Sequence, residues 1–431
     1  MATDVNTQFF SHLNGLKLTN TWGDLIRLLD KCLVNGITLP VISSATVDSS
    51  GHVTLVFEEN HKAVLFQIVQ LSGFAPSEYN LKYRVKGVPN ATTLVLKSES
   101  AAPSTQEVTG IGTAKLASLG YEIIFRDTGD VKRVYRAKNP TPQHPFIRVD
   151  ESIASATGTY AATYAKSAMF GLIEDMTHID DYQSTDKQQL PFLPSEPSKN
   201  WSITAKGAET WNVVRGWSKW YYALQAASQP VSDSATFTEF QTPSTLDRYF
   251  TLFGDRDAFY LNRNVSQNTK HKLLSGCGLY ESALTSDITP NWFLMSTFFD
   301  KVAGTNSTWS SIQKGLPLAR SEQSGAFMLV KYAYSKPTPN IDGLGVLPNY
   351  MTGNTDIYSS NNNSALQIPI YDSDKYLRGT LKHINFSGRW HDNVNGETTP
   401  MIFDSSMYLW ETMAVGLGAS GGVMVYLGEL E

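Results

Sequence analysis

Apolar residues recur with helical spacing in one short segment near the N-terminus. Those that fall on one face are Trp22, Leu25, Ile26, Leu29, Cys32 and Leu33. Asn20 or Thr21 can cap the segment, and Thr21 and Asp24 have the spacing of a capping box. Gly36 is a typical helix end. The pattern predicts a short amphipathic helix with Cys32 as a core residue. An apolar face without a neighbouring histidine argues against the alternative, a reactive thiol.

From about residue 40 the pattern changes to short runs rich in β-branched and aromatic residues. Four runs separated by turn residues are strand candidates, at residues 53–57, 63–69, 81–85 and 92–96. Their regular spacing favours a small antiparallel barrel or sandwich. The Ala- and Ser-rich residues 98–105 that follow predict a linker or a long turn.

Hairpin patterns dominate the rest of the chain. Two pairs of runs flank turns that contain glycine, and a proline-rich connection leads into a further strand. After about residue 300 the chain is rich in Gly, Ser, Asn and Pro, which predicts long loops. The strands predicted here span residues 121–125, 131–136, 146–150, 248–253, 258–261 and 423–427.

These patterns predict a mainly β protein built from small antiparallel barrel or sandwich domains in series, with a short N-terminal amphipathic helix. At 431 residues the chain is long enough for about two to four domains. The expected division is an N-terminal helical arm (1–40), a small β-barrel or sandwich domain (41–115), a central β domain (116–300) and a C-terminal β-rich, loop-rich domain (301–431).

The composition is low in charge and rich in aromatic residues. Charged residues make up 17% and aromatic residues 11% of the chain. Depletion of charge with enrichment of aromatic side chains is typical of protein interfaces, although a β fold rich in Ser, Thr and Tyr gives a similar composition. The 35 Lys and Arg residues are scattered and the net charge is −5, so nucleic acid is not expected as a principal ligand.

Neither a signal-peptide pattern nor a run of 18 apolar residues occurs, so we expect synthesis in a cytoplasm and no membrane span. The two cysteines, Cys32 and Cys277, are too few for a disulfide framework or a zinc site.

Five aromatic residues lie close together in a short stretch of the sequence: Trp211, Trp217, Trp220, Tyr221 and Tyr222. This cluster is interpreted as domain core, with an interface anchor or a glycan-stacking platform as alternatives.

No motif in the sequence predicts catalysis, a cofactor or a resident metal. Residues 416–421 match G-x-G-x-x-G, but the few residues after them leave no room for a dinucleotide-binding unit. Residues 174–181 collect possible metal ligands, for which a solvated acidic loop is the preferred interpretation. His391 and Asp392 are candidates for a general base pair. They adjoin in sequence, however, and neighbouring residues of an extended segment point to opposite faces, which argues against such a pair. A carboxylate pair for glycoside cleavage depends on spatial separation, so a polysaccharide-degrading enzyme stays an alternative.

Several short segments, in order along the chain, resemble a family of tailed-bacteriophage virion proteins. They are residues 22–25, 29–36, 79–85, 119–122, 132–136, 148–151, 254–256, 259–261 and 377–381. The sequence departs from the family pattern at Glu151, where a second aspartate would follow Asp150, and its C-terminal third matches least. The resemblance implies a structural protein of the tail or baseplate and carries no catalytic residues with it.

Sequence and resemblance together predict a non-enzymatic structural component of a phage virion, made in the host cytoplasm. Its expected partners are other virion proteins, and the symmetry of such particles favours a homo-oligomer or ring. The alternatives are a receptor- or glycan-binding protein at the tail tip that uses the aromatic cluster and, after it, the polysaccharide-degrading enzyme.

Overall fold

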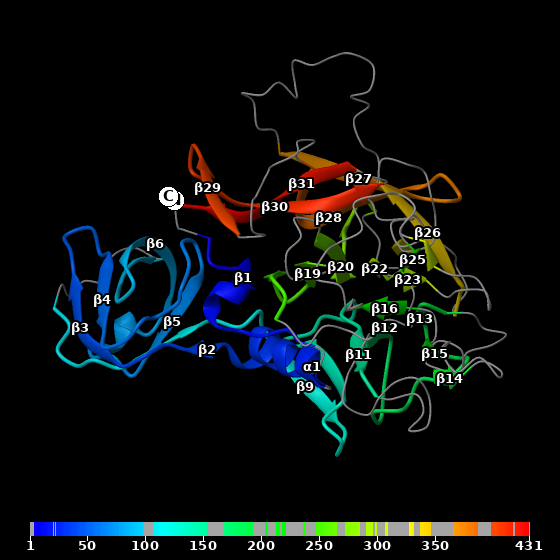
Figure 1. Ribbon diagram of the computed structural model, residues 1–431, viewed down its shortest axis with the longest axis horizontal. Helices are drawn as coiled ribbons and strands as arrows, with labels where there is room; N and C mark the ends of the chain where they lie inside the picture. The colour runs from blue at the N-terminus through cyan, green and yellow to red at the C-terminus, as the bar shows by residue number, and fades with distance from the viewer. Residues whose placement is uncertain are drawn as a thin grey trace, which may run out of the picture.

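The computed structural model describes most of the chain but not all of it (Figure 1). The described residues are 4–19, 21, 23–98, 107–152, 168–192, 247–264, 272–284, 290–295, 327–331, 337–345, 365–386, 398–416 and 419–430. Six further short strands are described by their backbone alone: β14 (Ile203–Ala205), β15 (Val213–Arg215), β16 (Ser218–Trp220), β17 (Thr236–Phe237), β23 (Phe298–Phe299) and β24 (Ser307–Thr308).

The prediction of a mainly β fold with a short N-terminal helix is confirmed, and the paired strands of every sheet are antiparallel. The N-terminal sheet has the order β2 (Ile37–Thr38), β8 (Thr113–Leu116), β5 (Ile68–Ser72), β6 (Lys82–Asn90), β7 (Thr93–Ser98), β4 (Val53–Phe57) and β3 (Ile42–Val47). Its two edge strands, β2 and β3, are separated in sequence by residues 39–41 alone, so the sheet curls toward a barrel, drawn in blue in Figure 1. The buried face carries Val53, Leu55, Tyr83, Leu94 and Leu96.

The strand predicted at residues 63–69 begins later than expected. Phe66 has φ 68, a left-handed conformation that a strand does not contain. The buried side chain of Gln67 explains the turn, because its Oε1 accepts the backbone N–H of Val64 and its Nε2 donates to the carbonyl of Phe9. The segment therefore turns around Gln67, and the strand starts at Ile68.

The largest sheet has thirteen strands. Its order is β1 (Gln8–Ser11), β18 (Phe250–Gly254), β19 (Ala258–Asn264), β20 (Lys272–Leu279), β22 (Trp292–Met295), β25 (Phe327–Val330), β26 (Asn340–Gly345), β27 (Leu366–Asp372), β28 (Leu377–Phe386), β31 (Ala419–Glu429), β30 (Ser406–Gly416) and β29 (Thr399–Phe403), with β21 (Glu281–Ser282) beside β28. Lys272 of β20 contacts Glu411 of β30, so strands far apart in this order face each other. The predicted domain ranges stay a prediction. The strands of this one sheet come from both sides of the predicted boundaries at residues 40 and 300.

A third sheet runs β23, β16, β12 (Ala168–Ile173), β11 (Phe146–Asp150), β10 (Lys132–Ala137) and β9 (Tyr121–Arg126), with β13 (Gln189–Leu190) beside β12. Two small sheets pair β14 with β15 and β17 with β24. One hydrophobic core runs through the barrel, the helix, the third sheet and the largest sheet, and includes Tyr83, Leu29, Val149 and Leu261. No helix in the described part of the chain is both long and apolar enough to cross a membrane.

The helix is α1 (Asp24–Leu29), which continues as a π-helix (Asp30–Asn35) up to Gly36; two 3-10 turns occur at His12–Asn14 and Ser77–Tyr79. The predicted capping box is wrong, because Gly23 at φ 81 takes the N-cap position and Thr19 binds the Asp24 carboxylate. The predicted apolar face is buried, apart from Trp22, which lies outside the described residues. Cys32 and Cys277 are both free and buried, and burial raises the pKa of each thiol, as suits core residues.

Candidate functional site

The predicted aromatic cluster lies almost wholly outside the described residues. This holds for Trp211, Trp217, Tyr221 and Tyr222, whereas the backbone of Trp220 ends β16 and pairs with Ala168 of β12. The interpretation of the cluster as core, interface or glycan site stays a prediction. His391, Asp392 and most of the predicted linker at residues 98–105 also lie outside the described part.

The acidic segment 174–181 forms ion pairs within the protein. Asp180 Oδ1 lies 2.9 Å from Lys132 Nζ and 2.7 Å from Arg148 Nη2. Burial raises the pKa of Asp181, but hydrogen bonds from Thr177 and Lys187 outweigh it and bring the pKa to about 2. Among the described residues no group of three or more His, Cys, Asp or Glu is placed to hold a metal ion. The segment is an exposed acidic loop with protein partners.

The described residues of the glycine-rich segment 416–421 are the end of β30 and the start of β31. Gly416 at the end of β30 pairs with Ala419 at the start of β31. A dinucleotide-binding loop would instead lead from a strand into a helix.

A cluster of ionisable side chains surrounds the β18–β19 turn. Asp257 Oδ1 lies 2.9 Å from His144 Nε2, and Asp257 Oδ2 is bound by Lys382 Nζ. His144 comes from the proline-rich connection before β11, and Lys382 comes from β28. One aspartate in a turn thus links the third sheet to the largest sheet. We call Asp255, Asp257, His144, Lys382 and His383 the junction cluster.

The tautomer of a neutral His144 ring follows from its neighbours. The backbone N–H of Thr141 donates to His144 Nδ1 at 2.9 Å, so in the neutral ring Nδ1 is the acceptor and Nε2–H donates to Asp257. The Thr141 hydroxyl also lies 2.8 Å from Nδ1. The order Thr–His–Asp resembles a nucleophile, base and acid, but the single lone pair of Nδ1 is already engaged by the backbone. The histidine therefore supports the loop and does not activate the hydroxyl.

Asp255 is held on both of its oxygens. Its Oδ1 accepts the backbone N–H groups of Asp257 and Ala258, which closes the turn, and its Oδ2 lies 3.1 Å from His383 Nε2. His383 Nδ1 lies 3.3 Å from the Thr7 hydroxyl, next to β1. The backbone of His383 has φ 66, in the left-handed region. Because this interrupts the strand alternation, the adjacent Lys382 and His383 both reach the same turn.

The electrostatics of the cluster keep both aspartates ionised. The hydrogen bond with His144 is the largest influence on Asp257 and lowers its pKa; Lys382 adds to this against the effect of burial. Burial raises the pKa of Asp255, but the contact with His383 outweighs it, and the net pKa is lowered. Neither aspartate is therefore suited to be the protonated acid that glycoside cleavage requires.

A cavity of about 580 Å³ adjoins the cluster. Its lining includes Asp255, Asp257 and the half-exposed Arg256, and the segments 119–120 and 138–139 form another side. Gly120 lies beside Arg256 and has φ +98, a backbone conformation that favours glycine. The cavity is thus bounded by segments of different sheets.

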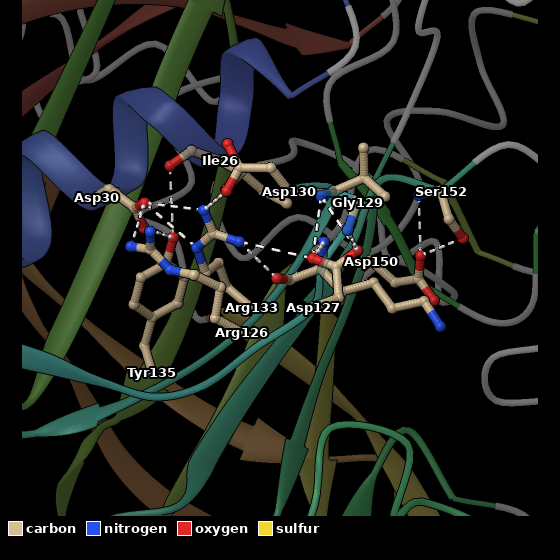
Figure 2. A network of polar contacts seen from close by, with 12 residues as sticks. Ile26, Asp30, Arg126, Asp127, Gly129, Asp130, Arg133, Tyr135, Asp150 and Ser152 are labelled. Carbon is tan, nitrogen blue, oxygen red and sulfur yellow. Dashed lines mark hydrogen bonds and ion pairs between the residues drawn. The ribbon is translucent and has the colours of Figure 1, made fainter.

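A second polar network fastens the helix to the β9–β10 hairpin (Figure 2). Figure 2 shows Arg126 and Arg133 directed at Asp30, where the α-helix passes into the π-helix. Tyr135 donates to Asp30 Oδ1 at 2.7 Å. Burial lowers the pKa of Arg133, but hydrogen bonds to Asp130 and Asp30 outweigh it and raise the pKa. Every member of this network has a charged or hydrogen-bonding partner, which is typical of a structural clamp.

Sequence reasoning predicted none of the junction cluster as a site. Residues 254–257 were predicted as a turn, and His144 lies in the connection that the prolines predicted. The one feature of the sequence that could have indicated this cluster was the pair of aspartates in that turn. A comparison with known protein families finds no matching family model, and no curated protein matches the sequence.

We expect Asp257→Asn to make the protein less stable at pH 7 by about 1–3 kcal/mol, because two cationic or hydrogen-bonding partners lose their carboxylate. A carboxyl with a lowered folded-state pKa stabilises the fold above its unfolded pKa, and this contribution is lost as the pH falls toward the folded value. The wild type should therefore lose more stability than Asp257→Asn on acidification below about pH 4. Thermal unfolding midpoints measured from neutral to acidic pH test this. The exposed Asp186→Asn is the control, and identical acid slopes for wild type and Asp257→Asn would contradict the prediction.

Proposed function

We propose that this chain is a non-enzymatic structural component of a tailed-bacteriophage virion, located in the tail or baseplate, and that it acts by assembling with other virion proteins. The observation that carries the proposal is the junction cluster. Its aspartates are ionised and engaged in joining the third sheet to the largest one, which suits a load-transmitting framework better than a reaction centre. The phage virion is the particle that the sequence resemblance implies.

The position of the resembling segments adds support. Residues 119–122 and 254–256 are far apart in sequence, and parts of both line the cavity beside the cluster. Residues 377–381 begin the strand that supplies Lys382 to Asp257. These three of the nine segments that resemble the virion family therefore lie where the sheets are joined.

Purification of virions followed by immunogold electron microscopy with an antibody against this chain tests the proposal. Labelling of the tail or baseplate, together with a fixed number of copies per particle by quantitative mass spectrometry, is the expected result. Particles without the chain would refute it. So would a chain that stays monomeric in gel filtration and binds no other tail protein.

An assay for new reducing ends on host surface polysaccharide separates this proposal from the enzyme alternative. No release is expected from the wild-type chain. Release that is abolished by Asp257→Asn, with the thermal unfolding midpoint still above the assay temperature, would make the junction cluster catalytic and overturn the non-enzymatic role.

A further inference from the structure

We propose that the side chains of Lys272 and Asn262 become joined by an isopeptide bond, and that Glu411 carries the protons of this reaction. The bond joins the neighbouring strands β19 and β20 covalently. The reaction takes place once and within one chain, so it is a self-modification and not an enzymatic activity. The inference goes beyond the proposed virion role and does not depend on it.

The amine and the amide meet at one carboxylate oxygen. Lys272 Nζ contacts Glu411 Oε2, and Asn262 Nδ2 donates to the same oxygen at 3.3 Å. Lys272 lies opposite Asn264, two residues along β19 from Asn262. Asn262 and Lys272 are therefore diagonal neighbours on one face of the sheet, within reach of a long side chain. Glu411 comes from β30, which lies against β20.

All three side chains are shielded from water. Those of Lys272 and Glu411 are 0% exposed, and Asn262 is 0% exposed as a residue. Burial away from water penalises charged groups more than neutral ones, which favours a neutral amine beside a neutral acid over what water would allow. The neutral amine is the form of lysine that acts as a nucleophile. Burial also keeps out water, which would otherwise compete with the amine for the amide carbon.

The carboxyl group of Glu411 is held in a fixed orientation. Thr251 donates to its Oε1 at 2.6 Å, and the Thr251 hydroxyl lies 2.8 Å from that of Thr398. This leaves Oε2 directed at the two groups that react. Groups held together in this way react as one molecule, which lowers the entropic barrier to forming the bond. Thr251 is thus a positioning residue for the carboxyl group.

The reaction needs no further reagent. Glu411 takes a proton from the Lys272 ammonium, and the freed lone pair of Nζ attacks Asn262 Cγ to form the new C–N bond. Glu411 gives this proton to Asn262 Nδ2 and takes a second proton from Nζ. The Cγ–Nδ2 bond then breaks, and Nδ2 leaves as ammonia. The products are a neutral secondary amide, a neutral carboxylic acid and ammonia.

The balance of charge favours the products. The reaction replaces a buried ammonium and a buried carboxylate by neutral groups, which removes the cost of keeping two charges away from water. Ammonia escapes into the solvent, where it is diluted. In a chain without the Glu411 carboxylate the proton carrier is missing, and Lys272 keeps its ammonium group.

Mass spectrometry of the intact, folded full-length chain tests the inference. The wild type should be lighter than its sequence requires by one ammonia molecule, whereas Glu411→Gln, Lys272→Met and Asn262→Ala should have their full masses. Fragmentation of proteolytic peptides should show residues 262 and 272 joined. Lys331→Met, which removes the lysine of the exposed pair with Asp374, is the control and should keep the loss of ammonia.

A wild-type chain that unfolds cooperatively and yet has its full sequence mass would overturn the inference, whether or not any variant folds. A loss of ammonia that persists in Lys272→Met, or that fragmentation places at a different asparagine, also overturns it. Neither result bears on the virion role, because particle labelling detects the chain with or without the bond.

Discussion

Replacement of Arg84 by methionine is expected to lower the free energy of unfolding by about 3–5 kcal/mol, the range for removal of one partner from a buried charged contact. The Arg84 side chain is fully buried. Its guanidinium donates to four backbone carbonyl oxygens, those of Asp4, Thr7, Phe66 and Leu427. Methionine fills a similar volume but leaves these buried acceptors without their donor, and each such group costs about 1–3 kcal/mol.

The partners of Arg84 explain why its loss should be felt across the fold. They belong to the N-terminal segment, the loop before β5 and the C-terminal strand β31, whereas Arg84 itself lies in β6 of the barrel. Burial lowers the pKa of Arg84 to about 10, so the guanidinium stays charged at neutral pH. One cation thus links the N-terminal segment and β31 to the barrel strand, next to the backbone hydrogen bond by which Phe66 is already joined to Val85 of β6.

Urea unfolding measures the loss, and hydrogen exchange locates it. Amides near Leu427 and Thr7 should exchange faster in Arg84→Met. Lys86→Met, an exposed lysine in the same strand, is the matched control and should stay within about 0.5 kcal/mol of the wild type. Equal unfolding midpoints for the two variants would show that Arg84 does not clamp the termini.

Local pattern was sufficient for strands that carry a clear signal. Residues 53–57 and 146–150 were predicted with the bounds that the structure has for β4 and β11. β12 was missed, because all of its residues are buried and an unbroken buried run lacks the alternation of a half-exposed strand. The π-helix was missed for a related reason, since sequence periodicity assumes regular α-helical turns.

The junction cluster could not be predicted, because its contacts are long-range. His144 and Lys382 meet Asp257 across 113 and 125 residues of sequence. The turn that places Asp257 was predicted, but no local rule says which distant histidine or lysine folds against it. The left-handed backbone of His383 is imposed by its surroundings, since a histidine alone does not favour it.

Glu411→Gln is expected to cost about 3–5 kcal/mol of stability, because it leaves a buried lysine without a counter-charge. The side chains of Glu411 and Lys272 are both 0% exposed, and Lys272 Nζ contacts Glu411 Oε2. Thr251 donates to Glu411 Oε1 at 2.6 Å, and Asn262 donates to Oε2 at 3.3 Å. Glutamine keeps the shape of the side chain and an oxygen that can accept from Lys272, so the variant mainly removes the charge.

The double variant Lys272→Met with Glu411→Leu decides between two roles for this pair. If the pair stabilises the fold mainly because each charge needs the other, the double variant should recover most of the stability that Glu411→Gln loses. Chemical denaturation of the wild type, Lys272→Met, Glu411→Leu and the double variant gives the coupling energy. Asp374→Asn, which breaks an exposed pair with Lys331 at 3.6 Å, is the control and should cost about 0.5 kcal/mol or less. A double variant less stable than either single variant would instead show that Thr251 and Asn262 depend on the carboxylate, and that the buried network as a whole joins β30 to the opposite strands.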